Sequence, residues 1–112
     1  RNDVVCLVAD RDIGGTGIEM DFFGERTSLP VGPALLARRT GAPLLPTAIY
    51  FRGRQRLAVV AEPIEAGAGR GRAENERLTR AVTDQLERMI AAAPEQWHVL
   101  EPNWPTDDEA AD

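Results

Sequence analysis

A short apolar run that stops at three charged residues constrains this chain more than any other feature. Every residue from Val4 to Ala9 is apolar, and Asp10, Arg11 and Asp12 follow at once. Continuous apolar runs of this length are typical of strands buried on both faces, so the run predicts a buried β-strand over residues 4–9. Because α/β proteins place their sites at the carboxyl ends of such strands, the charged triplet marks a candidate site.

A glycine-rich loop and an alternating segment come next. The loop over residues 14–17 lacks the lysine and the spacing of a Walker loop, and no GxGxxG pattern is present, so a nucleotide-binding P-loop is not expected. Residues 18–23 alternate apolar and acidic positions, which predicts an extended segment with Glu19 and Asp21 on one face. These carboxylates are candidate functional groups. Solvent-facing alternation on a half-buried strand is the ordinary alternative.

The region after Phe23 predicts further α/β elements. Residues 24–30 suggest a turn and a helix start, and Ala34 to Ala37 followed by Gly41 suggest a short helix with a glycine C-cap. Residues 44–51 predict a second buried strand, and residues 57–61 a third that forms a hairpin with it. The order strand, helix, strand from residue 4 to 51 suggests a crossover connection within one mixed sheet flanked by helices.

A long amphipathic helix is expected near the end of the chain, over residues 73–92. Its apolar residues recur at spacings of three and four and should pack on the sheet. Pro94 ends the helix, and residues 96–100 suggest a short docking segment. We expect residues 1–105 to belong to one domain and residues 106–112, which are polar and acidic, to be disordered. The apolar stripe consists of Leu78, Val82, Leu86, Met89 and Ile90.

Composition excludes several classes of protein. A chain of 112 residues accommodates one core, and a net charge of -5 argues against nucleic-acid binding. The lone Cys6 excludes an internal disulfide and fits a small buried residue in a reducing compartment. No apolar run approaches the roughly 20 residues that a membrane span needs. The start at Arg1 rather than Met suggests a piece of a longer protein.

Several motifs stand in an order that resembles a known family. ADRD, a glycine-containing loop, GIEMDFFGE, PVGPALLARRTGAPLLPTAIYF and a late QWH occur in succession between Val4 and Trp104. In this order they resemble the lysophospholipid and lipid A acyltransferase superfamily, and within it the phosphatidylinositol mannoside acyltransferases of actinobacteria. The resemblance is to the carboxyl-terminal part of such enzymes. It implies a glycerolipid-acyltransferase-like α/β fold, of which this chain is a fragment.

The resemblance also implies a reaction and its participants. A fatty acyl group would move from acyl-coenzyme A, a co-substrate, to a sugar hydroxyl of a glycolipid, with no metal or redox cofactor. The general base would be the histidine of a His-x4-Asp/Glu motif upstream of Arg1, and Glu19 would orient it. The chain alone should therefore be inactive. Such an enzyme would dock peripherally on the cytoplasmic face of the cell membrane.

The remaining candidates carry ordinary alternatives as well. Asp10 and Arg11 could order the site or bind an acceptor hydroxyl or phosphate, and Asp21 could bind substrate, but the charged triplet could also be a surface cluster of ion pairs. His98 is the only histidine and is expected to pack or cap. The arginines at positions 52, 54 and 56 could meet phosphates or simply be solvated. A non-catalytic lipid-binding or regulatory domain is the alternative function.

Overall fold

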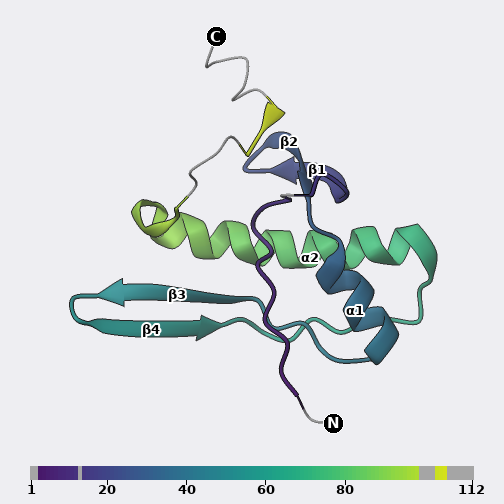
Figure 1. Ribbon diagram of the computed structural model, residues 1–112, viewed down its shortest axis with the longest axis horizontal. Helices are drawn as coiled ribbons and strands as arrows, with labels where there is room; N and C mark the ends of the chain where they lie inside the picture. Colours follow the sequence, from purple (N-terminus) through teal and green to yellow (C-terminus); the bar gives the residue numbers. More distant parts are fainter. Residues whose placement is uncertain (1–2, 13, 99–102, 106–112) are drawn as a thin grey trace.

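The computed structural model describes residues 3–12, 14–98 and 103–105. Two β-hairpins lie on either side of one long helix, α2 (Gly71–Ala92), as Figure 1 shows. The first hairpin pairs β1 (Ile18–Phe22) with β2 (Glu25–Leu29), and the second pairs β3 (Thr47–Arg52) with β4 (Gln55–Val60). The short helix α1 (Gly32–Thr40) connects the two hairpins and packs against α2.

The predicted single mixed sheet is wrong for the described residues. Each hairpin is a separate two-stranded antiparallel sheet. A turn and a helix start were expected over residues 24–30, but the turn consists of Phe23 and Gly24, and residues 25–29 form β2 instead of starting a helix. The reason is the turn itself: Phe23 and Gly24 both have positive φ, 53° and 79°. That geometry is the one that closes a two-residue hairpin, and it pairs Phe22 with Glu25.

The predicted first strand is also wrong. Residues 4–9 are extended in Figure 1 but belong to no strand, and the Cys6 side chain, expected to be buried, is exposed. Val4 and Val8 are 87% and 80% exposed. A strand needs a partner for its backbone groups. Within the described residues, β1 pairs only with β2 and β3 only with β4, and neither hairpin takes this segment as a third strand.

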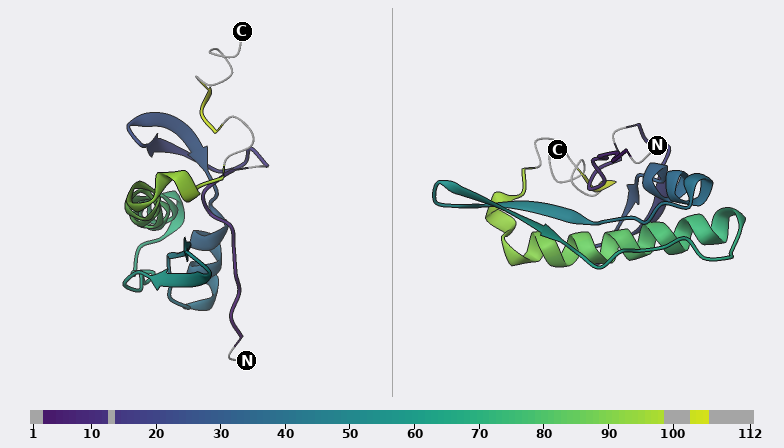
Figure 2. Two further views of the ribbon diagram at one scale, coloured as in Figure 1. Left: turned by 90° about the vertical axis from the view of Figure 1, so that its left-hand side faces the viewer. Right: turned by 90° about the horizontal axis from the view of Figure 1, so that it is seen from below.

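The expectations for the short helix and the second hairpin hold better. Helix α1 ends where predicted, with Gly41 in the left-handed conformation and its N–H bonded to the carbonyl of Ala37. Both strands of the second hairpin are present, and Pro46 precedes β3. The prediction that β3 is buried is wrong, because its side chains and those of β4 are largely exposed. Figure 2 shows that this hairpin projects past the end of α2.

The core lies between the first hairpin and α2. The inner face of this hairpin carries Met20, Phe22 and Leu29, all buried. Helix α2 buries Leu78, Val82 and Met89, three of the five residues of the predicted stripe, whereas Leu86 and Ile90 are only half-buried. The helix therefore begins and ends almost as predicted, and the short helix η1 (Pro94–Gln96) follows it.

Candidate functional site

The first hairpin presents its acidic residues on one face. Met20 and Phe22 point into the core, so the alternating side chains of Glu19 and Asp21 lie on the exposed face, as predicted. Cross-strand pairing places Ser28 opposite Glu19 and Arg26 opposite Asp21. The burial of two large apolar residues on one face thus fixes which face carries the carboxylates.

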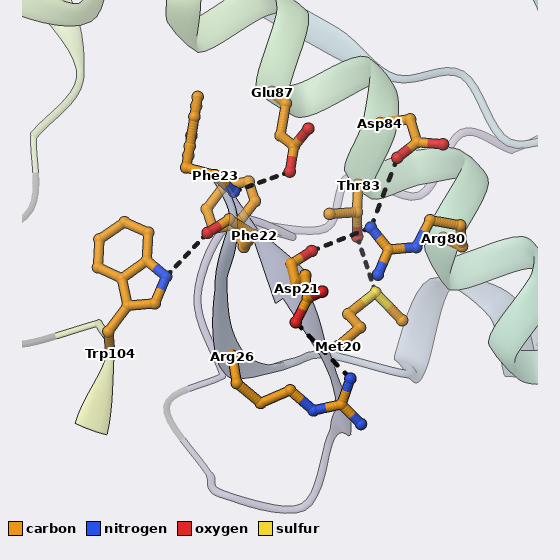
Figure 3. A network of polar contacts seen from close by, with 10 residues as sticks. All are labelled: Met20, Asp21, Phe22, Phe23, Arg26, Arg80, Thr83, Asp84, Glu87 and Trp104. Carbon is orange, nitrogen blue, oxygen red and sulfur yellow. Dashed lines mark hydrogen bonds and ion pairs between the residues drawn. The ribbon is translucent and has the colours of Figure 1, made fainter. Parts of the chain in front are cut away.

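The two carboxylates differ in their surroundings. Asp21 lies 3.7 Å from Nη1 of Arg26, and its backbone carbonyl accepts a 2.9 Å hydrogen bond from Nη1 of Arg80 on α2. Figure 3 shows Arg26 and Arg80 approaching Asp21 from different sides. The Glu19 side chain has no hydrogen bond or ion pair to any residue in the described ranges. Its carboxylate is therefore the one of the two that is available to a substrate or to another catalytic group.

Asp12 holds the glycine-rich loop against the first hairpin. Its Oδ2 accepts hydrogen bonds from the backbone N–H of Gly17, at 2.8 Å, and from the hydroxyl of Ser28. The loop also approaches β2 closely at Gly17, where a Cβ atom would lie 2.0 Å from the carbonyl oxygen of Leu29. Only glycine fits there without moving backbone. The carboxyl end of the loop is thus fixed just before Glu19.

Asp10 is tied to the far end of the chain. Its Oδ2 accepts a 2.7 Å hydrogen bond from the indole N–H of Trp97, 87 positions later. The Trp97 ring meets the buried Phe22 ring edge-on, and the Trp104 ring stacks on Phe22, contacts the Trp97 ring edge-on and donates its indole N–H to the Phe22 carbonyl. Of the predicted docking segment, Gln96 and Trp97 dock as expected, while residues 99–100 lie outside the described residues. Two aromatic rings cover Phe22 of β1. Arg11, which follows Asp10 in the chain, is half-buried.

A groove with a volume of about 750 Å³ opens beside Glu19, between the first hairpin and the first half of α2. Two carboxylates, those of Glu19 and Glu76, and four guanidinium groups line it, together with small and apolar residues. No sequence pattern indicated this groove. Its arginines come from β2 and α2, and in the sequence they are ordinary surface charges. The four arginines are Arg26, Arg72, Arg77 and Arg80.

The other candidates lie elsewhere. His98 is exposed, at the end of the segment that follows η1. Arg52, Arg54 and Arg56 are all exposed around the turn of the second hairpin, and the Arg56 guanidinium lies 4.8 Å from the centre of the Phe51 ring. In the described part of the chain, no group of three His, Cys, Asp or Glu side chains is arranged to hold a metal ion. None of its helices is long and apolar enough to cross a membrane.

Comparison with known proteins places the chain in a family. Residues 1–106 match the family of bacterial lipid A biosynthesis acyltransferases, and the chain belongs to that family. Among curated relatives, a phosphatidylinositol mannoside acyltransferase of Mycobacterium tuberculosis is 47% identical over 107 residues, 96% of this chain. The enzyme of the same name from Mycolicibacterium smegmatis is 39% identical over 106 residues, 95% of this chain. The chain spans about a third of the length of each, 33% and 34%.

Proposed function

We propose that this chain is part of an acyltransferase that moves a fatty acyl group from acyl-coenzyme A to a sugar hydroxyl of a membrane glycolipid. Membership of the family and the names of the mycobacterial relatives support the class of reaction and a phosphatidylinositol mannoside as acceptor. The observation that carries the proposal is the position of Glu19. It stands on an ordered strand, has no partner among the described residues, and faces a groove of substrate size.

Glu19 would act on a histidine that lies outside these 112 residues, in the part of the relatives' length that this chain does not span. A carboxylate beside a histidine holds the ring in one orientation and stabilises the imidazolium that forms when the ring takes a proton. His98 follows Trp97 in the chain and is exposed, and it is not assigned this role.

In the proposed reaction the histidine takes the proton of the acceptor hydroxyl. The hydroxyl oxygen then attacks the carbonyl carbon of the thioester, the carbon–sulfur bond breaks, and coenzyme A leaves as a thiolate that takes the proton back from the imidazolium. The product is an ester of the sugar, and no acyl group is bonded to the protein. No metal or redox cofactor enters the proposal.

Supporting roles follow for the other acidic residues. Asp21 would hold Arg26 at the edge of the groove, and Asp10 would bind substrate less directly than the sequence suggested, because Trp97 already occupies one of its oxygens. Arg11, half-buried next to Asp10, remains a proposed substrate contact.

We also propose that the enzyme works at the cytoplasmic face of the cell membrane, where both the acyl donor and the lipid acceptor are available.

The test is Glu19→Gln in a chimera in which this chain replaces the matching third of the M. tuberculosis relative. Glutamine keeps the shape of the side chain but removes its charge, so kcat should fall about a hundredfold or more, the usual contribution of a positioned acid–base group. The readout is release of coenzyme A from palmitoyl-coenzyme A that depends on a mannosylated phosphatidylinositol.

Asp21→Asn is the matched control, since it removes the neighbouring carboxylate on the same face, and it should lower kcat less. The 112 residues alone should release no coenzyme A. Near-normal turnover in Glu19→Gln with a large loss in Asp21→Asn would reverse the assignment. Turnover by the 112 residues alone that disappears in His98→Ala would overturn the placement of the base.

A further inference from the structure

The groove beside Glu19 is lined by more arginine than any other charged residue. Arg72, Arg77 and Arg80 reach it from α2, and Arg26 reaches it from β2 on the opposite wall. The carboxylates in the lining are those of Glu19 and Glu76 alone. The lining itself therefore carries two more positive charges than negative ones.

Acidic residues outside the lining also face these arginines. Asp21 lies 3.7 Å from Arg26, Asp84 lies 3.5 Å from Arg80, and the buried Glu74 is bonded to Arg77. Of these ion pairs only the one with Glu74 involves a buried group, at 4% exposure. Exposed ion pairs contribute little stability, so a ligand with stronger acceptors is able to replace them.

The arginines keep donors for such a ligand. The Arg72 side chain is 89% exposed and contacts Glu76 through Nε, while Arg26 contacts Asp21 through Nη1. A guanidinium group has five N–H donors in a planar fork, which matches two oxygens of one phosphate. Phosphate oxygens are thus better hydrogen-bond acceptors for these guanidinium groups than water is.

Spacing along α2 indicates the size of the ligand. Arg72 and Arg80 are eight residues apart on the helix, which corresponds to about 12 Å along its axis. Arg77 lies between them and Arg26 faces them across the groove. One free phosphate is too small to reach all four groups. A diphosphate, or a phosphodiester within a larger headgroup, has the required length.

We propose that this groove binds the phosphate-bearing part of a substrate and so places the reacting end beside Glu19. The inference rests on the proposed function, which offers two sources of the same chemistry. One is the diphosphate of coenzyme A, and the other is the phosphodiester of an inositol lipid. In either case the arginines fix the anionic part of the substrate while Glu19, which also lines the groove, stays available.

The test measures binding to the chimera described above by calorimetry, with no turnover involved. Coenzyme A is compared with pantetheine, which lacks phosphate, and glycerophosphoinositol is compared with inositol. In one of these pairs the phosphate compound should bind at least tenfold more tightly than its partner, and the pair that shows this identifies the source. Raising the salt concentration should weaken that binding.

The double variant Arg26→Gln/Arg72→Gln should lower the affinity about tenfold or more, since both side chains are exposed and their loss leaves the core intact. The control Arg39→Gln/Arg88→Gln removes the same charge from exposed positions outside the groove and should change the affinity less than twofold. If circular dichroism shows the first double variant to be unfolded, Arg72→Gln alone takes its place.

Equal affinities for phosphate and phosphate-free compounds, or equal losses in the groove and control variants, would overturn the inference. Phosphate binding by the groove in a protein whose chimera transfers no acyl group would support the groove and refute the proposed reaction. The two failures are therefore distinguishable.

Discussion

The two hairpins of this protein have the same length of turn and very different surroundings. Each has a two-residue turn, with Phe23 and Gly24 at positive φ in the first and Gly53 at positive φ in the second. The first hairpin buries Met20, Phe22 and Leu29 on the face that packs against α2 and two tryptophans. The second has apolar side chains exposed along both strands, among them Ile49, Phe51 and Val60.

The comparison separates what makes a hairpin from what makes a site. A two-residue turn and favourable cross-strand pairs are enough to form a ladder, and both hairpins have them. Only the first hairpin is held on one face by packing, which fixes Glu19 and Asp21 on the other. Because a functional group must be held in place by its supporting contacts, the candidate site belongs to the hairpin with the buried face.

The segment after α2 contacts both hairpins in different ways. Gln96 accepts a hydrogen bond from the N–H of Phe51 and donates one to its carbonyl, so its amide pairs with the edge of β3. Trp97, the next residue, places its ring on Phe22 of β1. One hairpin is thus held by polar contacts at its edge and the other by aromatic burial, which predicts unequal effects of substitution.

The largest effect on stability is expected for Phe22→Ala. The Phe22 side chain has 0% exposure and contacts both tryptophan rings, so its removal should cost about 3–5 kcal/mol of unfolding free energy. Chemical denaturation followed by tryptophan fluorescence measures this directly. A loss below about 1 kcal/mol would mean that the first hairpin is not held by its buried face.

A smaller effect is expected for Trp97→Phe, which keeps an aromatic ring but removes the N–H that binds Asp10. Hydrogen bonds to charged groups contribute about 1.5–3 kcal/mol, and this loss leaves a half-buried carboxylate without its donor. Trp104→Phe is the control, because its indole donates to a neutral carbonyl, and it should cost about 0.5–1.5 kcal/mol. Urea denaturation of the two variants ranks them, and the opposite order would contradict a role for Asp10 in holding the segment after α2.

Gln96→Ala should cost about 1 kcal/mol, because it removes two exposed hydrogen bonds to Phe51 that water replaces in part. The sharper measurement is hydrogen exchange of the Phe51 amide, which should accelerate while the amides of β1 stay as protected as before. Equal acceleration in both hairpins would show that the segment after α2 stabilises them as one unit.

The smallest effect is expected for Ile49→Thr. Ile49 is 63% exposed, and threonine keeps the β-branched shape that strands favour. The free energy of unfolding, measured by chemical denaturation, should therefore change by less than about 0.5 kcal/mol. A loss of 1 kcal/mol or more would show that the outer face of the second hairpin is covered in solution, and would remove the contrast between the hairpins.

Much of the candidate site followed from local sequence pattern. The alternation from Ile18 to Phe22 identified Glu19 and Asp21 as neighbours on one face, which the structure confirms. The charged triplet was expected at the carboxyl end of a strand that the described part of the structure does not contain. The bond from Asp10 to Trp97 joins residues 87 positions apart, and no spacing rule indicates it. The arginines of the groove were missed for the same reason, since β2 and α2 meet only in the folded chain.

By itself, the sequence determined the local backbone: the α2 helix and its amphipathic period, the glycine that ends α1, the turns of both hairpins and the face of β1 that carries the acids. Tertiary structure decided burial. An apolar run such as residues 4–9 predicts a strand whether or not another strand lies beside it, because periodicity reports only the conformation and polarity of the segment itself. Whether that segment is paired, and which hairpin is covered, depends on contacts between elements distant in the sequence.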